Sequence, residues 1–159
     1  MVCAPENYAR RITLMENAIT KTPGWFWVIA IIYLLWSFVG TGGYLVEHMM
    51  GDAAYEEAFG AEILSLRDLT PLWATAGYAI GVWGGFVGAI LILLRKKLCL
   101  PFFYASFLGA VIGFLPSIFD GRFKAVMGSG DYGLMIFIWL ICLFIIWFAR
   151  KTFAKGIIR

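Results

Sequence analysis

Four long apolar stretches are the feature that most constrains the fold of this chain. They cover residues 25–46, 71–94, 98–119 and 132–149, and none of them contains Asp, Glu, Lys or Arg. Coiled as helices, stretches of this length reach about 27–36 Å, which matches a hydrocarbon core of about 30 Å. Lipid offers no partner to an unpaired backbone group, so each stretch is expected to be helical. The sequence therefore predicts an all-α integral membrane protein, a four-transmembrane-helix bundle with short interfacial helices.

The composition supports a membrane domain and excludes an ordinary soluble one. Of the 159 residues, 62% are hydrophobic and 14% are charged, whereas soluble domains have about 45–50% and about 25%. We expect a cytoplasmic segment over residues 1–24, a transmembrane domain over residues 25–149 with an acidic outer loop at 47–70, and a basic cytoplasmic tail at 150–159.

The Lys and Arg residues divide unequally between the two sides of the predicted bundle. Ten lie on the side that holds both chain ends: Arg10, Arg11, Lys21, Arg95, Lys96, Lys97, Arg150, Lys151, Lys155 and Arg159. The other side has only Arg67, Arg122 and Lys124. The positive-inside rule then places both termini in the cytoplasm. This arrangement explains the net charge of +3 without a nucleic-acid partner.

Two segments outside the spans show helical periodicity. Tyr8, Ile12, Met15 and Ile19 recur beside two arginines, which favours a surface helix over residues 6–20, with a disordered tail as the alternative. In the outer loop, apolar residues fall on one helical face: Tyr55, Phe59, Ile63 and Leu66. Gly60 weakens this second helix.

The ends of the predicted helices carry capping residues. Thr22 and Thr70 each precede a proline, which suggests a capping hydroxyl followed by proline at the first helical position. Asp52 is expected to cap the outer-loop helix, and Asp131 the fourth span.

Small residues repeat along the second and third spans. Gly77, Gly81, Gly85 and Gly88 lie on one face of the second span, and Gly84 widens that face; on the third span Ala105, Gly109 and Gly113 are spaced by four. A phosphate-binding loop is excluded, because the run lies within a span and lacks Lys and Ser/Thr. The short connection at residues 95–97 makes the two helices antiparallel neighbours. We expect their small faces to meet, although one face left for another subunit is the alternative.

The polar residues give no pattern typical of catalysis, of a cofactor or of a metal. The single histidine, His48, follows Glu47 at the outer end of the first span, with Asp52 four residues on. No span contains a His for haem ligation or to activate a serine. Cys3, Cys99 and Cys142 have no metal-type spacing. We therefore expect no enzyme activity, no cofactor and no metal.

Three tryptophans lie near the middle of their spans: Trp36, Trp83 and Trp139. An indole N–H facing lipid would lack an acceptor, so these rings are expected to turn inward or to find carbonyl acceptors. With Ser37, Thr75 and Ser106 they would line a weakly polar midplane pocket able to stack on a sugar or a quinone. The alternative is that the rings fill space opposite the glycines.

Short motifs along residues 25–159 resemble a group of small four-span bacterial inner-membrane proteins, which automated labels sometimes call sugar transporters. The matching residues are Trp36, Gly40, Thr70-Pro71-Leu72-Trp73-Ala74, Gly81, Gly84-Gly85, Leu93-Leu94-Arg95-Lys96-Lys97, Pro101 and Trp147-Phe148-Ala149-Arg150. The resemblance implies a multi-pass protein of the bacterial inner membrane.

Two functions follow as hypotheses. The first is a non-catalytic accessory or structural subunit of a larger membrane complex, which contacts the lipid bilayer and associates with other subunits or with itself. The alternative is an oligomeric, uncoupled transporter of a small neutral solute such as a sugar.

Overall fold

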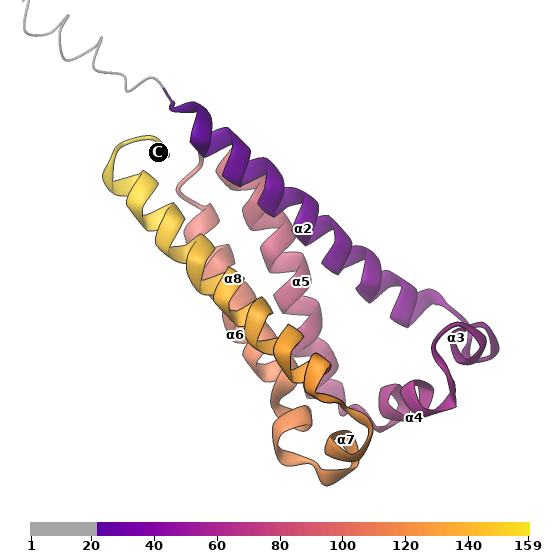
Figure 1. Ribbon diagram of the computed structural model, residues 1–159. Helices are drawn as coiled ribbons and strands as arrows, with labels where there is room; N and C mark the ends of the chain where they lie inside the picture. The colour runs from indigo at the N-terminus through magenta and orange to yellow at the C-terminus, as the bar shows by residue number, and fades with distance from the viewer. Residues whose placement is uncertain (1–21) are drawn as a thin grey trace, which may run out of the picture.

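The computed structural model describes residues 22–159, so the surface helix expected over residues 6–20 lies outside the described residues. Within this range all regular secondary structure is helical. Four helices are long and apolar enough to cross a membrane: α2 (Gly24–Met49), α5 (Leu72–Leu93), α6 (Cys99–Phe119) and α8 (Ser129–Ala154) (Figure 1). The predicted fold class, an all-α membrane bundle, is confirmed.

Three short helices gather at one end of the bundle. They are α3 (Asp52–Phe59), α4 (Ala61–Leu69) and α7 (Gly121–Val126). At the opposite end lie the start of α2, the α5–α6 connection and the residues that follow α8 (Figure 1). We call the first the outer end, after the side on which the sequence predicts it to lie, and the second the basic end. The second name reflects the Lys and Arg residues of the α5–α6 connection and of the end of α8.

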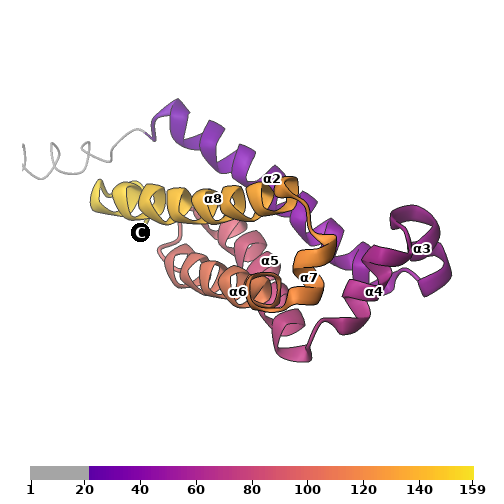
Figure 2. The ribbon, with the colours of Figure 1, turned by 60° about the horizontal axis from the view of Figure 1, so that its bottom comes forward.

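The helices α5 and α6 form the central pair of the bundle. The helix α2 packs mainly on α5, and α8 packs on α6. The two flanking helices contact each other through aromatic rings: Phe26 stacks on Phe148 at 5.8 Å between centroids, and Trp36 meets Phe137 edge-on at 5.6 Å. Figure 2 shows α2 and α8 on the same face of the α5–α6 pair. Both flanking helices therefore keep a large apolar surface that faces away from the bundle.

The most buried side chains lie near the basic end. All four long helices and the residues after α8 contribute to one hydrophobic cluster. Its members include Phe26 and Ala30 of α2, Ala89 and Ile92 of α5, Cys99 and Phe103 of α6, Ile145, Phe148 and Ala149 of α8, and Ile157 and Ile158. Thr152 is also fully buried, and its hydroxyl donates to the Phe148 carbonyl at 3.0 Å. The core thus closes the basic end of the bundle.

The residues after α8 fold back against the α5–α6 connection. The Arg159 N–H donates to the Arg95 carbonyl at 2.8 Å, and the Lys97 N–H donates to the Arg159 carbonyl at 2.6 Å. Arg95, which has a φ of 58°, donates from Nε to the Ile157 carbonyl at 2.7 Å. The sequence predicted a basic tail over 150–159. Instead α8 continues to Ala154, and the next residues bury Ile157 and Ile158 in the core.

The predicted capping threonines need correction, whereas Asp131 does contribute to the start of α8. Pro23 and Pro71 are themselves the N-caps, with extended backbone and no side-chain cap, so each helix begins one residue later than expected. Thr70 is the C-cap of α4, and its hydroxyl donates to the Leu66 carbonyl of that helix at 2.7 Å. It therefore does not cap α5. Asp131 lies at the third position of α8, where its carboxylate accepts from the Gly128 N–H at 2.8 Å.

The outer loop forms two helices where one amphipathic helix was expected. Gly60 separates them with a φ of +92°, a conformation that favours glycine. Gly51 is the N-cap of α3, so Asp52 belongs to its first turn and does not cap it. The expected continuous face is broken: Tyr55 is buried, whereas Phe59 and Ile63 are exposed.

Candidate functional site

The seam between α5 and α6 is built on direct contact between backbones. A Cβ atom added to Gly109 would lie 2.5 Å from the Gly81 nitrogen and 2.6 Å from the Gly77 carbonyl oxygen. A Cβ atom on Gly77 would lie 2.9 Å from the Gly113 nitrogen. Because a real Cβ atom does not approach backbone this closely, only glycine permits this helix separation. In lipid such close approach is a main source of helix association.

Other small residues of the seam face side chains or backbone of the neighbouring helix. A Cβ atom on Gly88 would collide with the Phe103 ring at 2.5 Å, and one on Gly84 would lie 3.3 Å from the Ser106 nitrogen. Ala105 is half-buried, and Ser106 rather than Ala105 takes the position opposite Gly84. The structure thus places the expected glycines of α5 against α6, with the small side chain shifted by one residue.

Hydroxyl groups from two helices meet Gly85 in the middle of the bundle. A Cβ atom on Gly85 would lie 3.1 Å from Ser106 Oγ, 3.2 Å from Tyr33 Oη and 3.8 Å from Ser37 Oγ. The Ser106 hydroxyl donates to the Gly81 carbonyl at 2.6 Å. The sequence singled out Ser37 and Ser106 but missed Tyr33. The spacing of four residues between Tyr33 and Ser37 places both on one helical face and could have revealed it.

The three midplane tryptophans do not line one pocket. Trp36 is half-buried against Phe137, and Trp139 is half-buried near Phe114, at 6.5 Å between ring centroids. Trp83 is 42% exposed and packs beside Phe86 on the outward side of α5. The expectation that all three rings turn inward is wrong for Trp83, because the glycine face of α5 takes the inward direction. Thr75 also lies elsewhere, beside a hollow at the outer end.

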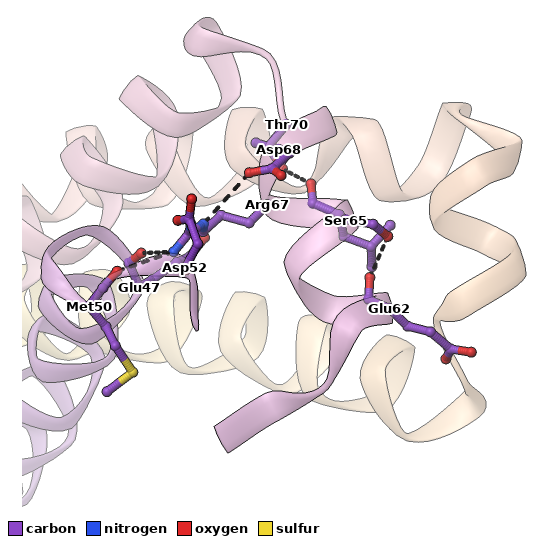
Figure 3. A network of polar contacts seen from close by, with 9 residues as sticks. Glu47, Met50, Asp52, Glu62, Ser65, Arg67, Asp68 and Thr70 are labelled. Carbon is purple, nitrogen blue, oxygen red and sulfur yellow. Dashed lines mark hydrogen bonds and ion pairs between the residues drawn. The ribbon is translucent and has the colours of Figure 1, made fainter. Parts of the chain in front are cut away.

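Arg67 organises the outer end of the bundle (Figure 3). From α4 its guanidinium donates to the carbonyls of Glu47 at 3.2 Å and Met50 at 3.4 Å, and it forms an ion pair with Asp52. It also lies 4.7 Å from the centre of the Tyr55 ring. The last carbonyls of a helix lack intrahelical donors and carry partial negative charge. The Arg67 guanidinium supplies both the missing hydrogen-bond donors and a compensating positive charge.

A polar hollow of about 310 Å³ opens beside this network. Its lining residues are Glu47, His48, Met50, Asp52, Arg67, Asp68, Thr70 and Thr75. His48 stacks on Tyr44, with centroids 4.2 Å apart, and its Nδ1 donates to the Tyr44 carbonyl at 2.9 Å. No cluster of three or more His, Cys, Asp or Glu side chains within residues 22–159 has a geometry that could hold a metal ion. The Arg67 guanidinium and the His48 ring both form their hydrogen bonds with groups of this chain.

The arrangement of the described residues supplies surfaces for helix packing. Within residues 22–159 the midplane holds hydroxyl, indole and thiol groups, and the charged side chains lie at the two ends. Comparisons with protein-family models, with curated proteins and with solved structures found no match.

Proposed function

We propose that the protein is a non-catalytic subunit of a larger complex in the bacterial inner membrane, bound to its partner through the outward face of α2. In this proposal the basic end lies in the cytoplasm, as the positive-inside rule favours. The partner contributes at least one apolar transmembrane helix.

The contrast between two groups of glycines carries the proposal. Every glycine of α5 and α6 would place an added Cβ atom 3.2 Å or less from a neighbouring element. Gly42 of α2 and Gly133 of α8 would meet nothing within 4 Å. Small residues within membrane helices are typical of helix–helix contacts. The glycines of the central pair serve the fold, whereas Gly42 and Gly133 on the flanking helices remain available to another chain.

The helix α2 is the better candidate of the two flanking helices. Of its most apolar stretch 22% is buried within the chain, against 33% for that of α8. Leu35, Val39, Gly42 and Val46 are spaced by four, three and four, so they form one ridge along the helix. Leu35 and Val39 are 60% and 69% exposed. We call these four residues the α2 ridge.

Site-specific photocrosslinking tests the proposal in native membranes. A photoreactive residue at Val39 is expected to form a crosslink to a second, different membrane protein, which mass spectrometry then identifies. The control position is Leu108 of α6, which is 59% exposed and should form no specific crosslink. Gly42→Leu should abolish the Val39 crosslink, while Gly133→Leu should preserve it. A lone monomer in mild detergent, with no crosslink at Val39, would count against the proposal.

Transport of a small neutral solute has less support. That hypothesis requires Trp36, Trp83 and Trp139 to share a pathway, and Trp83 lies on the outward side of α5. Liposomes containing the purified protein are therefore expected to take up labelled sugars no faster than empty liposomes. Uptake that weakens in Trp83→Ala would favour the transporter instead.

A further inference from the structure

Toward the basic end, one ridge of α8 changes from apolar to charged side chains along its length. Leu143, Trp147, Arg150 and Lys151 follow one another on the same face, and all four side chains are exposed. They line an open hollow of about 370 Å³ together with Ile146. From Leu143 to Lys151 the helix rises by about 12 Å. Over that distance the surface passes from apolar to aromatic to cationic.

The cations of this ridge have no acidic partner among the described residues. At the outer end Arg67 pairs with Asp52, and Arg122 pairs with Asp120 at 2.7 Å. Within residues 22–159, no ion pair is formed by Arg150 or Lys151. The Lys151 ammonium instead lies 4.6 Å from the centre of the Trp147 ring. Free positive charge is therefore concentrated beside an interfacial tryptophan.

We propose that this ridge is a binding site for an anionic phospholipid. The phosphate lies between Arg150 and Lys151, the glycerol and ester region lies at Trp147, and an acyl chain runs along Leu143. The order of the groups on the ridge is the order of the groups in such a lipid. Tryptophan is enriched at the depth where the esters lie, and its indole N–H is able to donate to an ester carbonyl.

Electrostatics distinguishes this lipid from a neutral one. Each Lys or Arg near an anionic lipid surface contributes about 1 kcal/mol, which corresponds to about fivefold in affinity. Within residues 22–159 these two adjacent cations have no acidic partner, so they retain this contribution for a ligand. A zwitterionic lipid, whose own cationic group offsets its phosphate, receives little of it.

Native mass spectrometry of the full chain in a neutral detergent tests the proposal with phosphatidylglycerol and phosphatidylcholine of matched acyl chains. Phosphatidylglycerol adducts are expected on the wild type and, at equal occupancy, on the control Lys124→Gln at the outer end. Arg150→Gln and Lys151→Gln should each weaken binding about fivefold. The charge-preserving variant Arg150→Lys/Lys151→Arg should retain it. Far-UV circular dichroism establishes that each variant is folded.

Three results would overturn the proposal. The first is equal occupancy by the two lipids on the wild type. The second is unchanged phosphatidylglycerol binding in folded Arg150→Gln/Lys151→Gln. The third is complete displacement of phosphatidylglycerol by glycerol phosphate at the same concentration. That result would show a site that binds the phosphate and makes no contact with the acyl chains. None of these results depends on a partner at the α2 ridge.

Discussion

At the residue scale, the missing side chain of glycine sets the distance between the two central helices. Gly109 is the clearest case, because an added Cβ atom would meet the backbone of α5 at two points, 2.5 Å and 2.6 Å away. Backbone cannot move aside as the end of a flexible side chain can. One methyl group is therefore enough to separate the helices.

Gly109→Ala is expected to destabilise the protein by about 1–3 kcal/mol through overpacking. Gly133→Ala is the matched control, since it adds the same methyl group to a helix where nothing lies within 4 Å. The control should be neutral or more stable by up to about 1 kcal/mol, because alanine is the better helix former. Thermal unfolding in detergent, followed by circular dichroism, measures both. Equal stability of the two variants would contradict the backbone contact.

Asp120 is the residue for which the structure predicts a pH dependence. It is the N-cap of α7, where its carboxylate accepts from the Arg122 N–H at 2.9 Å and from the Arg122 guanidinium at 2.7 Å. These side-chain and backbone hydrogen bonds from Arg122 lower the pKa of Asp120 from 3.8 to about 2. The charged carboxylate therefore stabilises the start of α7 fully above pH 3.8, and this contribution is lost as the pH falls through about 2.

An NMR titration of the Arg122 amide proton checks this assignment. Its chemical shift is expected to change with a midpoint at about pH 2, the pKa of Asp120. Asp120→Asn keeps a capping oxygen but does not ionise, so its Arg122 amide should show no such titration. A midpoint at the ordinary value of 3.8 would mean that the pairing with Arg122 does not form in solution.

At the scale of the element, one side chain holds the outer helices to the spans. Arg67 of α4 reaches the last carbonyls of α2 and pairs with Asp52 of α3, so it connects three helices. The helices α3 and α4 are short and have almost no buried side chains of their own apart from Tyr55. Their position therefore depends on Arg67 more than on packing.

Arg67→Gln is expected to loosen α3 and α4 without unfolding the bundle. Hydrogen bonds to charged groups contribute about 1.5–3 kcal/mol, so local opening should become about tenfold more frequent or more. Hydrogen–deuterium exchange measures this over residues 52–69, with α5 and α6 as internal references. Glu57→Gln, at an exposed position of α3, is the control and should leave exchange unchanged. Faster exchange throughout the bundle would show that Arg67 supports the fold as a whole.

The segment after α8 is a second element whose position depends on a few contacts. Ile157 and Ile158 are 3% and 1% exposed, and the neighbouring backbone bonds to the α5–α6 connection. This segment ties the end of α8 to the central helices at the basic end.

Ile158→Ala is expected to cost about 2–5 kcal/mol, as for other large-to-small changes of buried aliphatic residues. Phe153→Ala removes a larger side chain that is 47% exposed and should change stability much less. Thermal unfolding in detergent compares the two variants with the wild type. A larger loss in Phe153→Ala than in Ile158→Ala would contradict the buried position of Ile158.

At the scale of the whole molecule, the two ends of the bundle differ in charge and in structure. Among the described residues, the basic end has cations without acidic partners beside a closed core, whereas at the outer end Arg67 pairs with Asp52 and Arg122 with Asp120. The positive-inside rule predicts that this polarity fixes the orientation in the membrane.

Cysteine labelling in intact cells is expected to reveal that orientation. In a Cys3→Ser background, Glu57→Cys in α3 should react with a membrane-impermeant maleimide added outside. Lys96→Cys in the α5–α6 connection should react only after the cells are permeabilised. The native Cys99 and Cys142 are buried and should contribute little background. The opposite pattern would invert the orientation and place the lipid site on the other leaflet.

The sequence by itself determined the four spans and their helical character. These features follow from the length of each apolar run and from the need to pair every backbone group in lipid, and both are local. It also predicted which glycines share a face, because helical periodicity is fixed by the spacing of residues. The prediction that Thr22 and Thr70 are N-caps was wrong for a local reason too. Proline adopts the extended backbone of the N-cap as readily as the backbone of the first helical position.

Only the tertiary structure decided which faces meet and which remain free. The outward position of Trp83, the role of Tyr33 beside Gly85 and the partners of Arg67 all depend on how each helix is rotated about its axis. The return of Ile157 and Ile158 into the core joins residues about sixty positions apart in the chain, as the Arg95–Ile157 bond shows. Such contacts arise from the packing of whole helices, in which a small change in rotation exchanges one neighbour for another.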